Sequence, residues 1–247
     1  MNLTPTLKKF PLGAIRNPPI DAKIPAQGLN QLHVNAQTIG SLMICFDAVD
    51  EARVIAAGEP HLLPQRIERV GDVLLLESHN LNTSVQRGQN QKVLIEVHVP
   101  HETRLDLHLF AGVVMLKGGA GDVHIDGKFG EITGVTLAQN VDIRLQAGDV
   151  GFNDLRGVAN IRVAFGAVAL GWEKLYGAEK IDISCGCGAI DLRLPPSATA
   201  EHDFGGLLQD KTLSLPNSTH IHARVNFGAL DISHWQPKRT IKASIVI

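Results

Sequence analysis

The sequence predicts an all-β protein built as a single-stranded β-solenoid, a stack of similar coils with a β-rich N-terminal cap. Two distant segments, "LDLHLFAGVVML" (Leu105 to Leu116) and "IHARVNFGALDI" (Ile221 to Ile232), follow one template. Each has apolar residues at the first, third and fifth positions, glycine at the eighth, and apolar residues again at the tenth and twelfth. Alternation with a period of two indicates strands with one buried face, and its recurrence indicates stacked coils.

A glycine marks the same phase of every copy of this template. Such a glycine predicts a corner, where a Cβ atom would be crowded or φ must be positive. The predicted corners are Gly112, Gly121, Gly130, Gly148, Gly166, Gly188, Gly228 and, more weakly, Gly205. By this phase the core should contain Ile143, Val150, Ile161, Val168, Ile183 and Ile190. The exposed partners should be Asp142, Arg144, Asp149, Arg162 and Asp182.

The rest of the chain is interpreted as segments that flank the stack and cap its two ends. Residues 1–30 form a proline-rich arm, because Pro5, Pro11, Pro18, Pro19 and Pro25 favour an extended arm over a helix or sheet. Residues 31–100 form a β-rich cap and residues 101–232 the solenoid. Residues 233–247 hold a C-terminal capping strand, "TIKASIVI", and residues 31–247 make one structural unit.

Charge and composition exclude several partner classes. Lys and Arg number 23 against 25 Asp and Glu, without a basic cluster, so we expect no nucleic-acid partner. The longest uncharged stretch is too polar to span a membrane. The N-terminus lacks a signal-peptide pattern, and three cysteines argue against a disulfide framework, so the sequence predicts a cytoplasmic protein.

Several motifs resemble a known family. The opening "HVPHETRLDLHLFAG", the repeated G-D-V and G-A-V corners and the late "GAIDLRLPPSATAEHDFGG" are similar to the bacterial DUF4097 family, whose members are often labelled adhesins or toastrack domains. The resemblance covers most of the chain from Leu32 to Ile232. It implies a right-handed, single-domain β-solenoid and supplies no catalytic residues.

The sharpest local motif is "SCGCG", with Cys185 and Cys187. Two thiolates can bind Zn²⁺ or Cu⁺, but a complete site needs further ligands, and none lies nearby in the sequence. In the repeat phase both cysteines take inward positions. We therefore interpret them as small buried hydrophobic residues.

Two polar rows take outward positions. They are His220, His222 and Arg224 in "THIHAR", and Asp122, His124 and Asp126 in "DVHID". Either row would make a weak metal or anion site if rows of neighbouring coils align. A solvated strand face explains them equally, so the sequence predicts no catalytic, cofactor or metal site.

Three function classes remain open. The favoured one is a non-enzymatic scaffold or module that binds a protein partner, as a monomer or small homo-oligomer. The alternative is a self-assembling filament scaffold like the bactofilins. A carbohydrate-binding or carbohydrate-active β-helix protein is the third.

Overall fold

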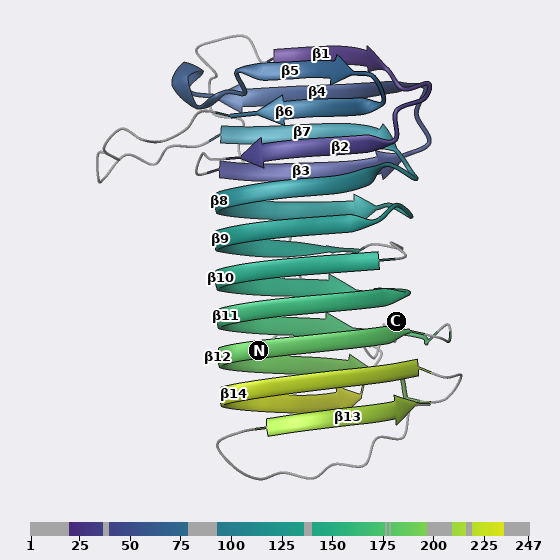
Figure 1. Ribbon diagram of the computed structural model, residues 1–247, viewed down its shortest axis with the longest axis vertical. Helices are drawn as coiled ribbons and strands as arrows, with labels where there is room; N and C mark the ends of the chain where they lie inside the picture. The colour runs from purple at the N-terminus through teal and green to yellow at the C-terminus, as the bar shows by residue number, and fades with distance from the viewer. Residues whose placement is uncertain are drawn as a thin grey trace, which may run out of the picture.

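The chain folds into an elongated stack of β-strands (Figure 1). A computed structural model describes residues 20–36, 40–78, 93–135, 140–175, 177, 179–196, 209–215 and 219–234. Nearly all of them are in strands of one sheet, as predicted, apart from a short 3₁₀ turn at Pro60–Leu62. The strands are β1 (Ile20–Pro25), β2 (Gln31–Ala36), β3 (Gly40–Asp47), β4 (Glu51–Gly58), β5 (Arg66–Val70), β6 (Val73–Glu77), β7 (Val93–Pro100), β8 (Arg104–Gly118), β9 (Val123–Val135), β10 (Asn140–Asn153), β11 (Val158–Gly171), β12 (Lys180–Leu194), β13 (Gln209–Leu215) and β14 (Thr219–His234).

The long strands β8 to β12 and β14 are the repeated coils. Each bends near its middle, so that its first half lies on the front of the stack and its second half on the rear (Figure 1). Neighbouring coils pair in parallel and in register, so that Ile125, Ile143 and Ile161 stack directly on one another. This arrangement is the coil stack that the sequence predicts, whereas its right-handedness remains a prediction.

The two halves of each coil enclose one continuous apolar core. All six predicted core residues, Ile143 and its equivalents, are at most 1% exposed. Among the predicted outward residues, Arg144, Asp149, Arg162 and Asp182 are exposed and Asp142 is half-buried. The inward and outward assignment of these positions is therefore confirmed.

The bend of each coil lies at a glycine that stacks on the glycine of the next coil. Gly166 pairs with Gly148 on one side and Gly188 on the other. Its φ of 144° is in the range that favours glycine, and a Cβ there would overlap the carbonyl oxygen of Gly148. Gly121 is not part of this column, because it lies in the turn that precedes β9, half a coil away from a corner.

The stack extends further toward the N-terminus than predicted. Within residues 31–100, assigned above to a cap, β2 pairs in parallel with the first half of β8 and β3 with the second half. The strands β6 and β7 add another level, parallel to β2 and β3. This region thus contains two coils, each split into two strands, as well as the antiparallel strands β5, β4 and β1 that close the end.

The strand β1 lies within residues 1–30, the segment expected to form a proline-rich extended arm. Ile20 to Pro25 pair antiparallel with β4, and Ile20, Ala22 and Ile24 pack against the core. A proline is compatible with this position because β1 is an edge strand and Pro25 is its last residue. Residues 1–19 lie outside the described residues.

At the opposite end, β13 pairs antiparallel with the first half of β14. The strand β13 was not predicted from the sequence. The expected capping strand at this end was Thr240 to Ile247, and these residues lie outside the described part of the chain. The limits of the four predicted segments remain a prediction.

The glycine column gives a direct test of the fold. We expect Gly166→Ala to destabilise the protein by about 2 to 5 kcal/mol, because alanine disfavours positive φ and its methyl group needs space that a backbone oxygen occupies. Denaturant unfolding would measure the change. Gly151→Ala is the matched control on the neighbouring coil, because a Cβ there would be 3.6 Å from the Thr133 Cγ2 atom, an ordinary contact. Equal stability of the two variants would contradict the crowded corner.

Candidate functional site

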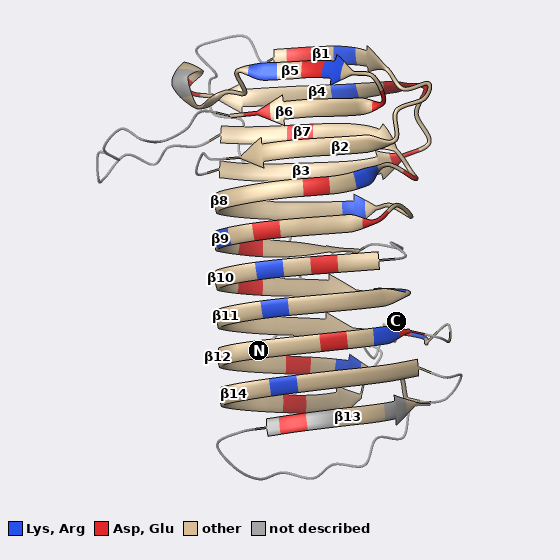
Figure 2. Cartoon of the chain, viewed as in Figure 1, with Lys and Arg blue, Asp and Glu red and all other residues tan. Residues whose placement is uncertain are grey.

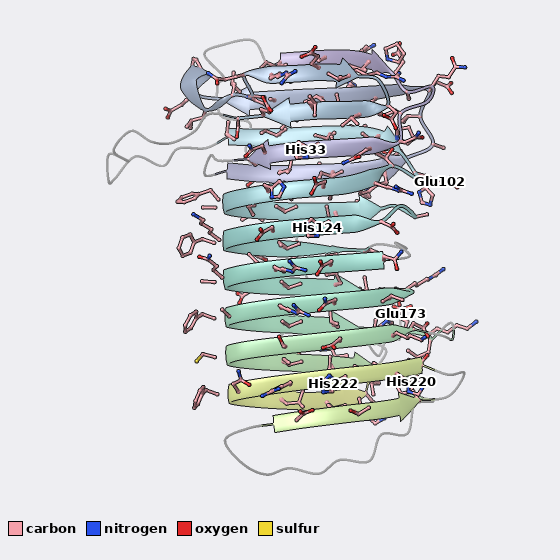
Figure 3. All side chains as sticks on the ribbon, viewed as in Figure 1. His33, Glu102, His124, Glu173, His220 and His222 are labelled. Atoms are coloured by element: carbon pink, nitrogen blue, oxygen red, sulfur yellow. The ribbon has the colours of Figure 1, made fainter. Side chains whose placement is uncertain are left out.

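A ladder of polar side chains runs along the front of the stack. It takes the same outward position in successive coils, and histidine and aspartate dominate it. Figure 3 labels three of its members, one near each end and one between them. The front-face ladder consists of His33, Asp106, His124, Asp142, Asn160, Asp182 and His222.

The histidines of this ladder pair with carboxylates of adjacent strands. The His33 Nδ1 atom is 2.9 Å from the Asp106 Oδ2 atom, and the His124 Nδ1 atom is 3.4 Å from the Asp142 Oδ2 atom. His222 lies between Asp210 on β13 and Asp182 on β12, at 2.7 and 3.5 Å. Because these side chains are partly exposed, each pair contributes only about 0 to 1 kcal/mol to stability. The ladder therefore presents polar groups to solvent without being required by the fold.

A shallow, open hollow accompanies the upper part of the ladder. Its polar lining comes from neighbouring outward positions of β8 to β11. These residues are Asp106, Asp122, His124, Asn140, Asp142 and Asn160, together with Arg104 and Gln31. Both charge signs are interspersed along the visible face (Figure 2), so the hollow suits a small polar ligand better than a polyanion.

The outward rows predicted from the sequence align across coils. His124 stacks beside Asp106 and Asp142, and His222 stacks beside Asp182, all within the front-face ladder. Asp126, His220 and Arg224 lie in the columns on either side, opposite Arg144, Lys180 and Ser184 respectively. A weak metal or anion site was expected only if the polar rows of neighbouring coils align, and the rows do align. The expectation that no metal binds there remains a prediction.

The two cysteines of "SCGCG" lie in different environments. Cys185 is inward and buried, and its thiol donates a hydrogen bond to the Gly166 carbonyl oxygen at 3.4 Å. Burial, reinforced by neighbouring Cys187, raises the pKa of the Cys185 thiol. The predicted inward position of Cys187 is wrong, because this residue is half-buried at the corner, between Phe165 and Phe227.

Cys187 belongs to an apolar surface at the corner that the sequence analysis missed. Phe165 and Phe227 are 61% and 62% exposed. They project from β11 and β14, and Cys187 of β12 lies between them; the polar residue Asn226 borders Phe227. This corner patch consists of Ala164, Phe165, Ala167, Cys187, Ala189, Phe227 and Ala229.

The wrong prediction for Cys187 is explained by the corner, where the alternation of inward and outward residues shifts by one position. In β8 the inward residues of the first half end at Leu109, and those of the second half begin at Val114. The interval is odd, so the alternation does not continue through the bend. The residue before each corner glycine, such as Phe165, points outward although extrapolation from the first half places it inside. This shift was readable from the odd interval in the template itself.

The same edge is different nearer the N-terminus. There Phe110 and Phe129 pack edge to face, with ring centroids 6.0 Å apart, and the Lys128 ammonium lies 5.6 Å from the Phe110 centroid. These contacts partly cover the rings with other side chains. The most exposed rings on this edge are therefore Phe165 and Phe227, while Phe129 remains 49% exposed.

Comparison with known proteins gives limited similarity. No protein-family model matches the chain, and no curated protein matches its sequence. A solved structure of a proposed cell adhesion protein from Clostridium sporogenes shares 14% identity and a TM-score of 0.36, over 88% of this chain and all of the other. A proposed adhesin from Bacteroides fragilis shares 14% identity and a TM-score of 0.42, over 89% of this chain and 96% of the other. Membership of the DUF4097 family remains a prediction.

The comparison contradicts the predicted cytoplasmic location. Both similar structures are named as adhesion proteins, and the predicted cytoplasmic location is withdrawn. The cysteine count is also a poor indicator of location here. Cys45 and Cys185 are buried, and a buried thiol stays reduced even without a reducing compartment. Among the described residues, no helix is long and apolar enough to cross a membrane.

The different environments of the cysteines predict their reactivity. Under native conditions at neutral pH, we expect Cys187 to react with a thiol reagent at least roughly tenfold faster than Cys185, because Cys187 is accessible and burial raises the pKa of Cys185. Mass spectrometry of samples taken at successive times would show which of the two cysteines carries the label. Equal labelling rates, or faster labelling of Cys185, would contradict this placement of the corner.

Proposed function

We propose that this protein is a non-enzymatic β-solenoid module that binds a protein partner through the corner patch. The observation that carries the proposal is the exposure of two phenylalanine rings, Phe165 and Phe227, on one uncharged edge. A contiguous exposed apolar surface of this kind is typical of an interaction site. Aromatic side chains at such sites contribute strongly to binding.

The corner patch is presented on a rigid base. Each ring stands next to a stacked glycine: Phe165 lies on β11, which pairs with β10 and β12, and Phe227 lies on β14, which pairs with β12. Little backbone freedom is then lost when a partner binds, which favours affinity. Phe165 and Phe227 belong to coils separated by one coil, about 10 Å apart at the usual spacing of strands.

The patch favours an apolar partner surface. None of its seven residues is charged. The Asp149 carboxylate of the preceding coil accepts a hydrogen bond from the Ala167 amide at 2.9 Å. A partner with an apolar centre and a polar rim fits this arrangement, as in typical protein interfaces.

A filament scaffold remains the second candidate. One observation favours it: neighbouring coils pair in parallel and in register, so a coil of another molecule could continue the same stack. The antiparallel strands β13, β5 and β4 oppose it, because they interrupt the parallel register that head-to-tail stacking of coils would need.

The carbohydrate hypothesis rests on the front-face hollow rather than on the corner. Both polar and apolar side chains line the hollow, and its carboxylate, amide and imidazole groups could bind hydroxyl groups. A catalytic glycosidase would also need an acid and a second carboxylate positioned around a bond, and the hollow is open and shallow. We therefore keep sugar binding as a subsidiary possibility for the front face and propose no enzymatic role.

A pair of matched double variants tests the proposed interface. Affinity capture from the native host with the intact protein would first identify candidate partners, and binding of each purified candidate would then be measured. We expect Phe165→Ser combined with Phe227→Ser to weaken binding by at least about tenfold, since buried aromatic anchors dominate interface energy. Arg162→Ser combined with Arg224→Ser is the control, because it changes the front face of the same two coils and should change affinity less than about twofold.

The outcomes separate the candidate functions. Partner binding that survives the phenylalanine substitutions, or is lost only in the arginine variant, would refute the corner interface. Light scattering of the intact protein over a range of micromolar concentrations tests the alternative. A constant mass supports a discrete module, whereas filaments would favour the self-assembling scaffold.

A further inference from the structure

A cluster of metal-ligand side chains lies on the rear face near the N-terminal end. It is formed by the adjacent parallel strands β3 and β7, where Cys45 stands opposite His98 in register. Glu96 precedes His98 by two residues and therefore points to the same face of β7. One ligand atom each from Cys45, Glu96 and His98 lies within 4.8 Å of the others.

The imidazole of His98 is held between two carboxylates. Its Nδ1 atom is 3.0 Å from the Asp47 Oδ2 atom, and its Nε2 atom is 2.8 Å from the Glu96 Oε1 atom. Metal-binding histidines have this form: one nitrogen faces the metal while a carboxylate orients the other. Here Asp47 has the orienting position at the Nδ1 atom, and the Nε2 atom faces Glu96.

Cys45 has an unusual position for a thiol. It takes an outward place on β3, between Met43 and Asp47, yet it is only 5% exposed. Among the described residues, no hydrogen bond involves its sulfur. Burial raises the pKa of this thiol, and the carboxylates of Asp47 and Glu96 raise it further. In the absence of a cation the thiol is therefore neutral and lacks a polar partner.

We propose that Cys45, Glu96 and His98 bind a Zn²⁺ ion, with Asp47 orienting the imidazole of His98. Thiolate, imidazole and carboxylate are the three ligand types that zinc favours, and a fourth position would remain open to water. The ion would join β3 to β7 and so link the two N-terminal coils to each other. This site is independent of the corner patch and of the partner proposed for it.

The charges around the cluster favour a divalent cation. Asp47 and Glu96 bring two carboxylates to a single imidazole, and zinc binding would convert the thiol to a thiolate by releasing its proton. The nearby cations only partly offset this charge. Lys117 faces Cys45 from β8 and is exposed, and Arg53 faces His98 from β4 but forms a bidentate ion pair with Asp21.

A second cluster on the front face provides a comparison within the same molecule. His33, Asp106 and His108 also bring their ligand atoms within 4.8 Å of one another. All three are more exposed than Cys45, and the cluster has no thiolate. Sulfur ligation therefore distinguishes the two sites by spectroscopy as well as by mutation.

Titration of the intact protein with Co²⁺ tests sulfur ligation directly. We expect an intense near-ultraviolet thiolate-to-cobalt band that added Zn²⁺ abolishes. The band should disappear in Cys45→Ser and persist in Cys187→Ser, which removes a more accessible thiol elsewhere. Absence of the band from the intact protein, or its loss only in Cys187→Ser, would overturn the proposal.

Competition with a chromophoric chelator then measures Zn²⁺ affinity. We expect Glu96→Gln to weaken binding by at least about tenfold, and Asp47→Asn by about 10- to 100-fold through the lost orienting contact. His108→Ala should leave affinity unchanged, and a loss confined to that variant would assign zinc to the front cluster instead. Thermal unfolding in the absence of metal shows whether each variant is folded. If Cys45→Ser does not fold, the affinity of Glu96→Gln decides whether the cluster binds Zn²⁺.

The pH dependence gives a separate readout. Below the raised thiol pKa, binding must displace a proton from Cys45, so Zn²⁺ affinity should increase about tenfold for each pH unit above pH 7, where proton loss from the thiol dominates the pH dependence. In Cys45→Ser that slope should largely vanish. An affinity independent of pH in the intact protein would show that the thiol is not a ligand.

Discussion

The close approach of stacked glycines at the corner is the constraint on which the rest of the structure depends. Each corner glycine carries a positive φ and places its α-carbon against the carbonyl oxygen of the glycine one coil away. A side chain at Gly166 or Gly188 would force the coils apart, and the parallel hydrogen bonds on both sides of the bend would be lost with it. The glycine column therefore sets both the tight bend and the register of the coils.

That register converts a repeated sequence into columns on the surface. Residues at the same phase of successive coils become direct neighbours, at about 4.8 Å. Histidine and aspartate at one outward phase produce the front-face ladder, whereas alanine, phenylalanine and cysteine beside the glycine produce the corner patch. Neither surface is needed to hold the stack together, since the core lies between the two halves of each coil. Surface chemistry can thus vary along the stack while the fold is maintained.

The sequence was sufficient to predict the strands, the core and the polar face of β8 to β12 and β14, because each of these coils is one continuous segment with a regular alternation. It was insufficient where contacts join distant segments. The coil of β6 and β7 follows β4 and β5 in the chain but lies beyond β2 and β3 in the stack, an order that periodicity cannot reveal. The cluster of Cys45, Glu96 and His98 was missed for the same reason, because its residues come from two such strands. Phe165 and Cys187 were misplaced because the bend changes parity.

The two ends of the stack show how a repetitive fold becomes a finite molecule. A parallel coil exposes at its last level the same hydrogen-bonding edge that binds the coil before it, so an identical coil could always be added. The antiparallel strands β4 and β5 at one end, and β13 at the other, present a different spacing of hydrogen bonds and halt that addition. Their sequence need not follow the glycine template, and none of the three contains the corner phase. The departure from the repeat is therefore itself a structural feature: antiparallel strands cover the N-terminal level of the stack and the first half of β14 at the other end, where another parallel coil would otherwise pair.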